Sequence, residues 1–557
     1  MGLIALGRAR QLARLRANWG KPIPRTRNMD AIAACHRSRF ASAPRPTGEL
    51  DHRTWRDLNL DEVFEVLDRT ESTLGQHALY HRLRTAPVAD HLAAFDALVS
   101  QMGADPALRE RTQMVLARLQ DPHGYDLWWL AGENAIESRA WYVLFPFLSA
   151  ITVLLVVLTP FFPQILPALV AAFFINLLVR YTTDRQIGAV AAAFRQIAPV
   201  IAAGERLSFL GSDDIQPLVA SLRSDAPRLG RLKTIARWIS GDPFMLPMSA
   251  SPLALLINNI ISSVYEYLNL AFLLDANGVY FGVEELRSRG CALLRLLAAI
   301  GEVDAAISVA SVRAGRNDWT RPRFRATGTP VLFKGVRHPL VDDAVPNSMA
   351  IDFGHGALIT GSNMSGKSTF LRTIGVAAVM AQTLDTCLAS EYEAPVLHVR
   401  SCIGRTDDLL TGKSYYIAEV EALLDLVDAS ASASSHLFLL DEVFRGTNAV
   451  ERIAAGQAVL RELVVSAKRA RPHVVLAATH DSELVDLLSD LYTPWHFGDA
   501  VSTEGLIFDH RLQPGRATTR NAIALLRLHG APNSLIESAL TCAAELDRQR
   551  GSTLAGR

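Results

Sequence analysis

A glycine-rich loop followed by Lys-Ser-Thr is the part of this sequence with the clearest chemistry. The loop at positions 361–369 consists of Gly361, Ser362, Asn363, Met364, Ser365, Gly366, Lys367, Ser368 and Thr369. Glycines let backbone N–H groups curl around phosphate oxygens, and the lysine brings a positive charge to the β- and γ-phosphates. The hydroxyl of Ser368 would be a ligand of Mg²⁺ at the start of the next helix. The pattern therefore predicts a site for ATP and Mg²⁺.

Two later segments could complete this site. The apolar run at 436–440 ends in Asp441 and Glu442. In such an arrangement Asp441 supports Mg²⁺, and Glu442 orients and polarises the attacking water. A further apolar run at 474–478 leads to His480, which would lie near the γ-phosphate as a sensor. We expect Glu442, His480 and Lys367 to be the catalytic residues, although a histidine at a strand end can also have no role.

The elements needed to position these groups are visible in the sequence. A short apolar run at 357–360 precedes the loop and a helical pattern follows it. Strand, loop and helix in this order form the context that a phosphate-binding loop requires. We therefore expect an α/β P-loop ATPase domain over residues 319–545.

The residues around these motifs resemble those of one ATPase family. Residues 360–372, TGSNMSGKSTFLR, are similar to the P-loop of the MutS family of DNA mismatch repair ATPases in the Asn-Met pair and the trailing Arg. The segments at 335–339 and 345–347 resemble the lead-in of that domain, and those at 512–515 and 528–532 resemble its end. The resemblance implies an ATPase domain of the ABC/MutS type.

The resemblance also implies roles that the spacing alone does not. Val345 would lie near the adenine. Residues 403–419 are similar to the MutS signature segment, in which Ser414 would reach the nucleotide of the opposite subunit. The chain is therefore expected to act as a dimer, most simply a homodimer. Phe444 and Asn448 replace small residues of the family's second motif, and we expect them to affect communication across the dimer.

A role in DNA repair or mismatch repair follows from the resemblance alone. Mismatch recognition in classical MutS uses a Phe-x-Glu wedge, and none of the 22 phenylalanines here is followed two positions later by glutamate. We expect the mismatch-recognition domain and the Smr nuclease module of some relatives to be missing. DNA binding is thus one hypothesis, and a membrane-anchored ATPase scaffold or remodeller that does not bind DNA is the alternative. A transporter is disfavoured because the Leu-Ser-Gly-Gly-Gln signature is absent.

A long stretch without charge indicates a membrane segment. Residues 140–179 contain no charged residue, although charged residues make up 20% of the chain. Residues 141–158 and 165–179 each approach the length of a membrane-spanning helix, and two prolines would turn the chain between them. Arginines flank the pair at positions 139, 180 and 185. We expect a two-helix transmembrane hairpin at 138–182, with both termini and the ATPase domain in the cytoplasm. A buried helical hairpin in a soluble core is the alternative.

The rest of the middle region has a helical pattern. Residues 58–137 and 183–318 are rich in Leu, Ala, Arg and Glu at helical spacing, so we expect a helical core, or lever, that the hairpin splits. The segments at 67–75 and 299–306 are similar to the helical core of MutS proteins. The apolar run at 247–274 contains a glutamate, which predicts a buried helix of the soluble part rather than a third span. The expected fold is mixed: an α-helical core with a transmembrane hairpin, followed by an α/β P-loop domain.

The N-terminal region is basic in a chain that is neutral overall. Residues 1–57 hold twelve Lys or Arg against four Asp or Glu, whereas the whole chain has 56 of each kind. A basic N-terminal arm can bind phosphates or anionic lipid headgroups, but a solvated helix face or a targeting peptide has the same composition. Residues 546–557 are expected to be a tail. The five scattered cysteines fit neither a disulfide framework nor a zinc site, as in a reducing compartment.

Overall fold

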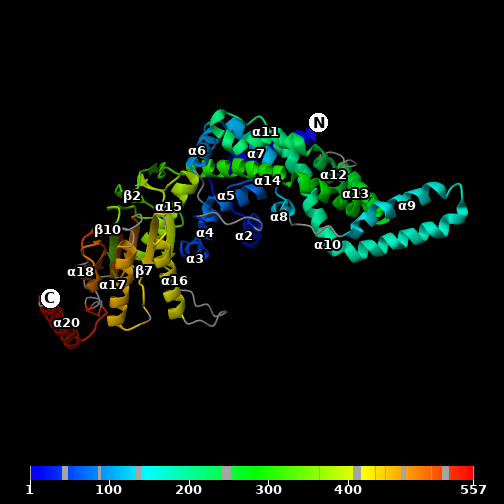
Figure 1. Ribbon diagram of the computed structural model, residues 1–557. Helices are drawn as coiled ribbons and strands as arrows, with labels where there is room; N and C mark the ends of the chain where they lie inside the picture. Colours follow the sequence, from blue (N-terminus) through cyan, green and yellow to red (C-terminus); the bar gives the residue numbers. More distant parts are fainter. Residues whose placement is uncertain are drawn as a thin grey trace. The chain divides into compact units, whose positions relative to one another are not determined.

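The computed structural model describes the chain except for residues 1, 41–47, 86–88, 133–139, 241–251, 363, 405–414, 433, 446, 466–471, 503–504, 517–522, 524–525, 528 and 556–557 (Figure 1). The chain forms two compact units. The first contains Met1–Glu49, Phe64–Asn317 and Thr383–Asp385, and the second contains Leu50–Val63, Asp318–Gln382 and Thr386–Arg557.

The first unit is built from helices. They are α1 (Gly2–Asn18), α2 (Met29–Ser38), α5 (Thr73–Arg84), α6 (Ala89–Ala104), α7 (Pro106–Leu116), η1 (Pro122–Tyr125), α8 (Asp126–Leu130), η2 (Ala140–Val143), α9 (Leu144–Leu158), η3 (Pro163–Ile165), α10 (Leu166–Leu207), η4 (Asp213–Ile215), α11 (Gln216–Ser224), η5 (Ala226–Leu229), α12 (Gly230–Ser240), α13 (Pro252–Phe272) and α14 (Leu274–Ala314). The short helix α4 (Leu60–Leu67) contributes residues to both units.

The long helix α14 organises this unit, because α5, α6, α10, α11 and α12 all pack against it. Its buried Asp304 accepts hydrogen bonds from the backbone N–H groups of Glu71 (2.9 Å) and Ser72 (2.7 Å), although Glu71 lies 233 residues earlier. Gly75 approaches so closely that a Cβ atom would lie 2.2 Å from the Asp304 carboxylate. The two segments that resemble the MutS helical core, at 67–75 and 299–306, therefore pack against each other.

Several arginines of the basic N-terminal region pair with acidic residues of the same unit. Arg25 and Arg27 both bind the fully buried carboxylate of Asp68, at 2.6 and 2.8 Å. Two further ion pairs are Arg14–Glu71 and Arg16–Glu110. Four of the twelve basic residues of this region thus have acidic partners in the helical unit, whereas Arg8 and Arg10 are exposed.

Helices α9 and α10 form a hairpin whose apolar side chains face outward. Figure 1 shows α9 and the first half of α10 running side by side beyond the other helices of the first unit. Phe147, Phe174 and Leu178 are each more than 60% exposed. Within the hairpin, the Asn176 amide donates hydrogen bonds to Thr152 Oγ1 (2.9 Å) and to the Ala271 carbonyl (2.6 Å), which joins α9, α10 and α13.

Among the described residues, one helix is long and apolar enough to cross a membrane by length and composition. It is Pro163–Thr182, and only 6% of its apolar window is buried. The other apolar helix, α9, has 15 residues. The structure thus gives one helix of spanning length where the sequence analysis expected two. Within the described part of this chain, other segments leave that helix largely uncovered.

Helix α13 is helical as expected, but the prediction that it is buried is wrong for residues 259–261 and 263–272, the part whose burial the structure describes. Ile260, Val264, Tyr267 and Leu268 form an exposed apolar stripe, and Tyr267 is 74% exposed. The opposite face carries the buried Tyr265 and Asn269. Glu266, the residue that argued against contact with lipid, forms an ion pair with Arg180 of α10 at 3.2 Å. Apolar spacing alone does not distinguish a face packed on a core from one left uncovered.

The second unit combines two β-sheets with helices. Its strands are β1 (Arg323–Phe324), β2 (Val331–Val336), β3 (Asn347–Ile351), β4 (Gly356–Thr360), β5 (Glu391–Ala394), β6 (His398–Cys402), β7 (His436–Asp441), β8 (Val474–Ala478), β9 (Tyr492–Ser502) and β10 (Gly505–Pro514). Its helices are α3 (His52–Asp57), α15 (Lys367–Leu384), α16 (Tyr415–Ser430), α17 (Ala449–Val465), α18 (Ser482–Leu487) and α20 (Asn533–Ala555).

The larger sheet has the order β10-β9-β4-β8-β7-β6. Strand β9 is parallel to β4, and β4, β8, β7 and β6 are mutually parallel, whereas β10 is antiparallel to β9. Every residue of β4 and β8 is buried, because a parallel sheet is covered on both faces and its strands read as continuous apolar runs. The smaller sheet has the order β1-β5-β2-β3. The α/β fold expected for this part of the chain is therefore present.

A short N-terminal segment, residues 50–63, belongs to this second unit. The carboxylate of Asp57 at the end of α3 accepts hydrogen bonds from Ser401 Oγ (2.8 Å) and from the backbone N–H of Gly404 (3.1 Å). Its carbonyl accepts one from Arg372 of α15 at 2.8 Å. From the sequence we expected the arm to end at residue 57 and the ATPase domain to begin at residue 319. Residues 50–63 nevertheless belong to the same compact unit as that domain, although they lie far from it in sequence.

Candidate nucleotide-binding site

The glycine-rich loop joins the end of β4 to the start of α15. Gly361 has φ +147° and Gly366 has φ +112°, conformations that residues with a side chain rarely adopt. Met364, with φ +69°, lies between them and is 84% exposed. The hydroxyls of Ser362 and Ser365 are buried and have no hydrogen-bond partner among the residues that the structure describes. The loop therefore has the backbone shape and the polar lining that phosphate oxygens require. Asn363 lies outside the described residues.

Lys367 is the first residue of α15 and is only 5% exposed. Its Nζ atom donates hydrogen bonds to the carbonyls of Gly361 (3.0 Å) and Ser362 (2.9 Å) and lies 3.3 Å from His480 Nε2. A buried ammonium is strongly stabilised when it meets negative oxygens. The side chain is thus held beside the loop, where phosphate oxygens would replace the carbonyls as acceptors.

Ser368 and Asp441 meet at the end of β7. The Ser368 hydroxyl donates a hydrogen bond to the Asp441 carboxylate. Burial raises the pKa of Asp441, while the bond from Ser368 opposes this shift. The Asp441 Oδ1 atom is buried and has no hydrogen-bond partner in the described part of the chain. A hydroxyl and a carboxylate with an unused oxygen are ligands that Mg²⁺ accepts together with phosphates, so these two residues fit the ion.

Glu442 and His480 face each other beside this pair. Glu442 Oε1 lies 2.5 Å from His480 Nε2, and Glu442 Oε2 lies 2.5 Å from an Arg445 guanidinium nitrogen. Burial and the Lys367 ammonium lower the pKa of His480, while Glu442 opposes this shift. The ends of the neighbouring strands β4, β8 and β7 therefore bring together the phosphate-binding and catalytic residues expected from the sequence.

Comparison with known proteins agrees with this geometry. Residues 357–547 match the family model for MutS domain V. The DNA mismatch repair protein MutS of Natronomonas pharaonis is 32% identical over 249 residues, which cover 43% of this chain and 28% of that protein. MutS of Thermus thermophilus is 32% identical over 276 residues, covering 49% of this chain and 32% of that protein. DNA mismatch repair protein MutS 2 of Halobacterium salinarum is 34% identical over 271 residues, covering 47% and 30%.

The C-terminal part of this chain is therefore similar to MutS proteins, and residues 357–547 match their domain V. The resemblance inferred from the P-loop and its neighbouring segments is therefore confirmed for this part of the chain. The matched region spans only about a third of the length of the curated relatives, 28% to 32% in these three. The helical unit with its apolar hairpin lies mostly outside the match to MutS domain V.

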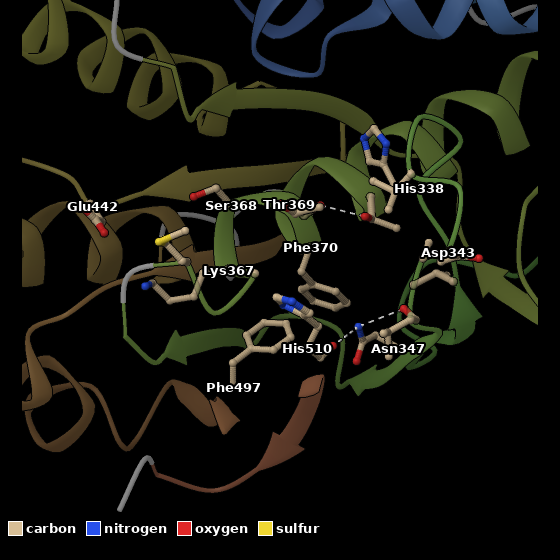
Figure 2. A pocket seen from close by; sticks show the side chains of 17 residues that line it. His338, Asp343, Asn347, Lys367, Ser368, Thr369, Phe370, Glu442, Phe497 and His510 are labelled. Carbon is tan, nitrogen blue, oxygen red and sulfur yellow. Dashed lines mark hydrogen bonds between the residues drawn. The ribbon is translucent and has the colours of Figure 1, made fainter. Parts of the chain in front are cut away.

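A cavity of about 370 Å³ continues from the P-loop toward β3, β9 and β10. Val345, the residue expected near the adenine, lines it together with Asp343 and Thr369. Figure 2 shows the side chains of Phe497 and His510 gathered between the P-loop and Asn347. The cavity thus extends the phosphate site into a region where rings and amide groups could hold a base.

Asn347, Phe497 and His510 line this cavity, but no role was predicted for them from the sequence. His510 Nδ1 lies 3.1 Å from the Ser365 carbonyl of the P-loop. The Asn347 amide donates a hydrogen bond to the His510 carbonyl (2.9 Å) and accepts one from the Leu512 N–H (2.7 Å). The Phe497 ring lies edge to face with that of Phe370, at 6.0 Å between centroids. The similarity of residues 345–347 and 512–515 to MutS segments could have indicated a site at these positions, but only Val345 was given a role from it.

His338, within the lead-in segment, also lines the cavity. Burial, and to a smaller extent Arg372, lower its pKa to about 4, so the imidazole is neutral. Its Nδ1 atom accepts a hydrogen bond from the Leu340 N–H at 3.3 Å, and among the described residues its Nε2 atom has no partner. Ser414, expected to act on the opposite subunit, lies outside the described residues.

Proposed function

We propose that this chain binds ATP with Mg²⁺ and hydrolyses it to ADP and phosphate. The observation that carries this proposal is the meeting of Lys367, the Ser368–Asp441 pair, Glu442 and His480, which come from the segments that follow the neighbouring strands β4, β7 and β8. Mg²⁺ at Ser368 and Asp441 would neutralise charge on the phosphates. Substitutions of Lys367 and Glu442, described in the Discussion, test the proposal.

Each side chain has a separate role in the proposed reaction. Lys367 exchanges its hydrogen bonds to loop carbonyls for bonds to phosphate oxygens. Glu442 orients and polarises the attacking water, which needs its carboxylate to be ionised and correctly aimed. His480, placed between Lys367 and Glu442, senses whether the γ-phosphate is present. The cavity lined by Val345, Phe497 and His510 holds the adenine.

We further propose that the chain works as a homodimer switched by the nucleotide. The support is the similarity of residues 403–419 to the MutS signature segment, which gives Ser414 the role of contacting the nucleotide of the second subunit. Each chain would then provide most of one site and one residue of the other. Binding and hydrolysis of ATP would thereby change how two copies associate.

DNA binding, with a role in DNA repair or mismatch repair, is the proposal that the relatives' names support. We expect one DNA form, among homoduplex, mismatched and branched duplexes, to stimulate ATP hydrolysis by the full chain. Contacts to phosphates release counterions, so the stimulation should weaken as salt rises. The measurement is the steady-state hydrolysis rate with each DNA across a salt series. A rate that no DNA changes at any salt concentration would favour a scaffold or remodeller that does not bind DNA.

We propose that the hairpin of α9 and α10 inserts into a membrane, with both termini and the ATPase domain in the cytoplasm. Its support is the outward-facing apolar surface and the low burial of Pro163–Thr182. We therefore expect the full chain to float with phosphatidylcholine vesicles. The double variant Leu154→Arg with Phe174→Arg should remain in the soluble fraction, because arginine in the middle of a bilayer costs roughly 2.5–3.5 kcal/mol.

Val450→Arg is the control for this flotation experiment, because Val450 is 79% exposed on α17 of the other unit. This variant should float as the wild-type chain does. A wild-type chain that stays soluble in the presence of vesicles would contradict insertion. Equal flotation of the wild-type chain and the double arginine variant would show that the hairpin is not the segment that binds lipid.

A further inference from the structure

The backbone that carries Glu442 has an unusual conformation. Glu442 has φ +49° and Phe444 has φ +60°, so two non-glycine residues within three positions lie in the left-handed region. This region is unfavourable for residues with a side chain, and most of all for bulky ones such as phenylalanine. Surrounding contacts must therefore hold the segment in place.

One such contact comes from helix α16. Glu419 Oε1 accepts a hydrogen bond from the backbone N–H of Phe444 at 2.6 Å, and Glu419 is only 7% exposed. The low dielectric of a buried site strengthens such a hydrogen bond. The carboxylate thus fixes the backbone two residues after Glu442.

Two other contacts act on the same segment from different directions. The Phe444 ring is buried in the core beneath the larger sheet, together with Leu423 and Leu426 of α16. The backbone N–H of Glu442 donates a hydrogen bond to the Ala478 carbonyl of β8 at 2.9 Å. Loss of the Glu419 bond would leave a buried N–H without an acceptor and would let Phe444 return to a favourable φ. The direction of the Glu442 side chain would change with it.

We infer that Glu419 is a positioning residue for hydrolysis, which acts through the Phe444 N–H to aim Glu442 at the attacking water. The inference rests on the proposed role of Glu442 in hydrolysis. Glu419 lines no part of the nucleotide cavity, so it affects the orientation of Glu442 and not the binding of ATP. A displacement of about 1 Å in a catalytic group can cost roughly 100-fold in rate.

The test compares two substitutions of similar size in the full chain. Glu419→Gln keeps an oxygen that can accept the bond, whereas Glu419→Met fills the same space without an acceptor. We expect Glu419→Met to lower kcat for ATP hydrolysis by roughly 10- to 100-fold with little change in KM. Glu419→Gln should stay within about threefold of the wild-type kcat, because it retains a neutral acceptor. Asp428→Ala, an exposed carboxylate on the same helix, is the control and should leave both constants unchanged.

The double variant Glu419→Met with Glu442→Gln separates positioning from a structural role. If Glu419 acts through Glu442, Glu419→Met should produce little further loss in the Glu442→Gln background. Thermal unfolding and ATP affinity are measured on every variant, and Glu419→Ala is a second acceptor-free variant should Glu419→Met fail to fold. Equal losses in Glu419→Gln and Glu419→Met, weakened ATP binding, or additive losses would overturn the inference. Wild-type hydrolysis by Glu442→Gln would instead overturn the proposed function.

Discussion

Replacement of Glu442 by glutamine is expected to preserve ATP binding and to slow hydrolysis by roughly 100- to 10,000-fold, the usual contribution of a general base. Glutamine has almost the same shape as glutamate but cannot polarise the attacking water through a negative charge. It can still reach His480 and Arg445, the two groups that hold the carboxylate at 2.5 Å. The measurement is single-turnover hydrolysis together with the equilibrium affinity for ATP.

Glu462→Gln is the matched control for this variant. Glu462 is exposed on α17 of the same unit, and the same change of charge there should leave hydrolysis unaffected. Hydrolysis by Glu442→Gln at the wild-type rate would show that Glu442 is not the group that activates water. A loss of ATP binding in Glu442→Gln would show that the carboxylate has a different role.

Replacement of Lys367 by alanine is expected to weaken ATP binding itself. The ammonium is buried and donates hydrogen bonds to the carbonyls of Gly361 and Ser362. Two hydrogen bonds from it to phosphate oxygens, at about 1.5–3 kcal/mol each, correspond to roughly a 100-fold loss of affinity or more. The measurement is titration with a fluorescent ATP analogue in the presence of Mg²⁺.

Lys334→Ala provides the comparison, because Lys334 is an exposed lysine on β2 of the same unit. Its affinity for the ATP analogue should match that of the wild-type chain. An unchanged affinity in Lys367→Ala would contradict the assignment of residues 361–369 as the phosphate-binding loop. Thermal unfolding without nucleotide shows whether the variant is folded.

The phosphate and catalytic residues could be predicted because each lies at the end of a buried strand or in the loop and helix that follow it. Parallel strands of an α/β sheet read as short apolar runs, and their carboxyl ends meet at one edge. Asp441 is the last residue of β7, His480 lies two residues after β8, and Lys367 follows β4 through the glycine-rich loop and begins α15. Local sequence therefore contains enough information to place them together.

Contacts between distant segments could not be predicted in this way. Asn347 binds the carbonyl of His510 across 163 positions, and Ser401 binds Asp57 across 344 positions. These pairs, which are far apart in sequence, are brought together by the order of the strands and the docking of α3. No spacing rule in the sequence relates their residues. The bond from Phe444 to Glu419 depends in addition on a left-handed backbone, which a phenylalanine does not indicate.

The helical unit shows a different limit of sequence analysis. The apolar stretches were assigned correctly to helices, and the long uncharged run does form exposed helices. In α13, however, a stripe that includes Val264 and Tyr267 faces outward although the pattern indicated burial. Periodicity shows which residues share a face of a helix, and the surroundings of that face depend on the rest of the fold.

The most direct test of the central claim is the hydrolysis of ATP by the purified full chain, measured with Mg²⁺ and again after chelation of the ion. The hydrolysis rate of the Glu442→Gln variant, measured in the same way, is the background rate. We expect the wild-type rate to saturate with ATP, to exceed the rate of Glu442→Gln by roughly 100-fold or more and to disappear on chelation. A wild-type rate equal to that of Glu442→Gln, or one unaffected by chelation, would contradict ATP hydrolysis at this site.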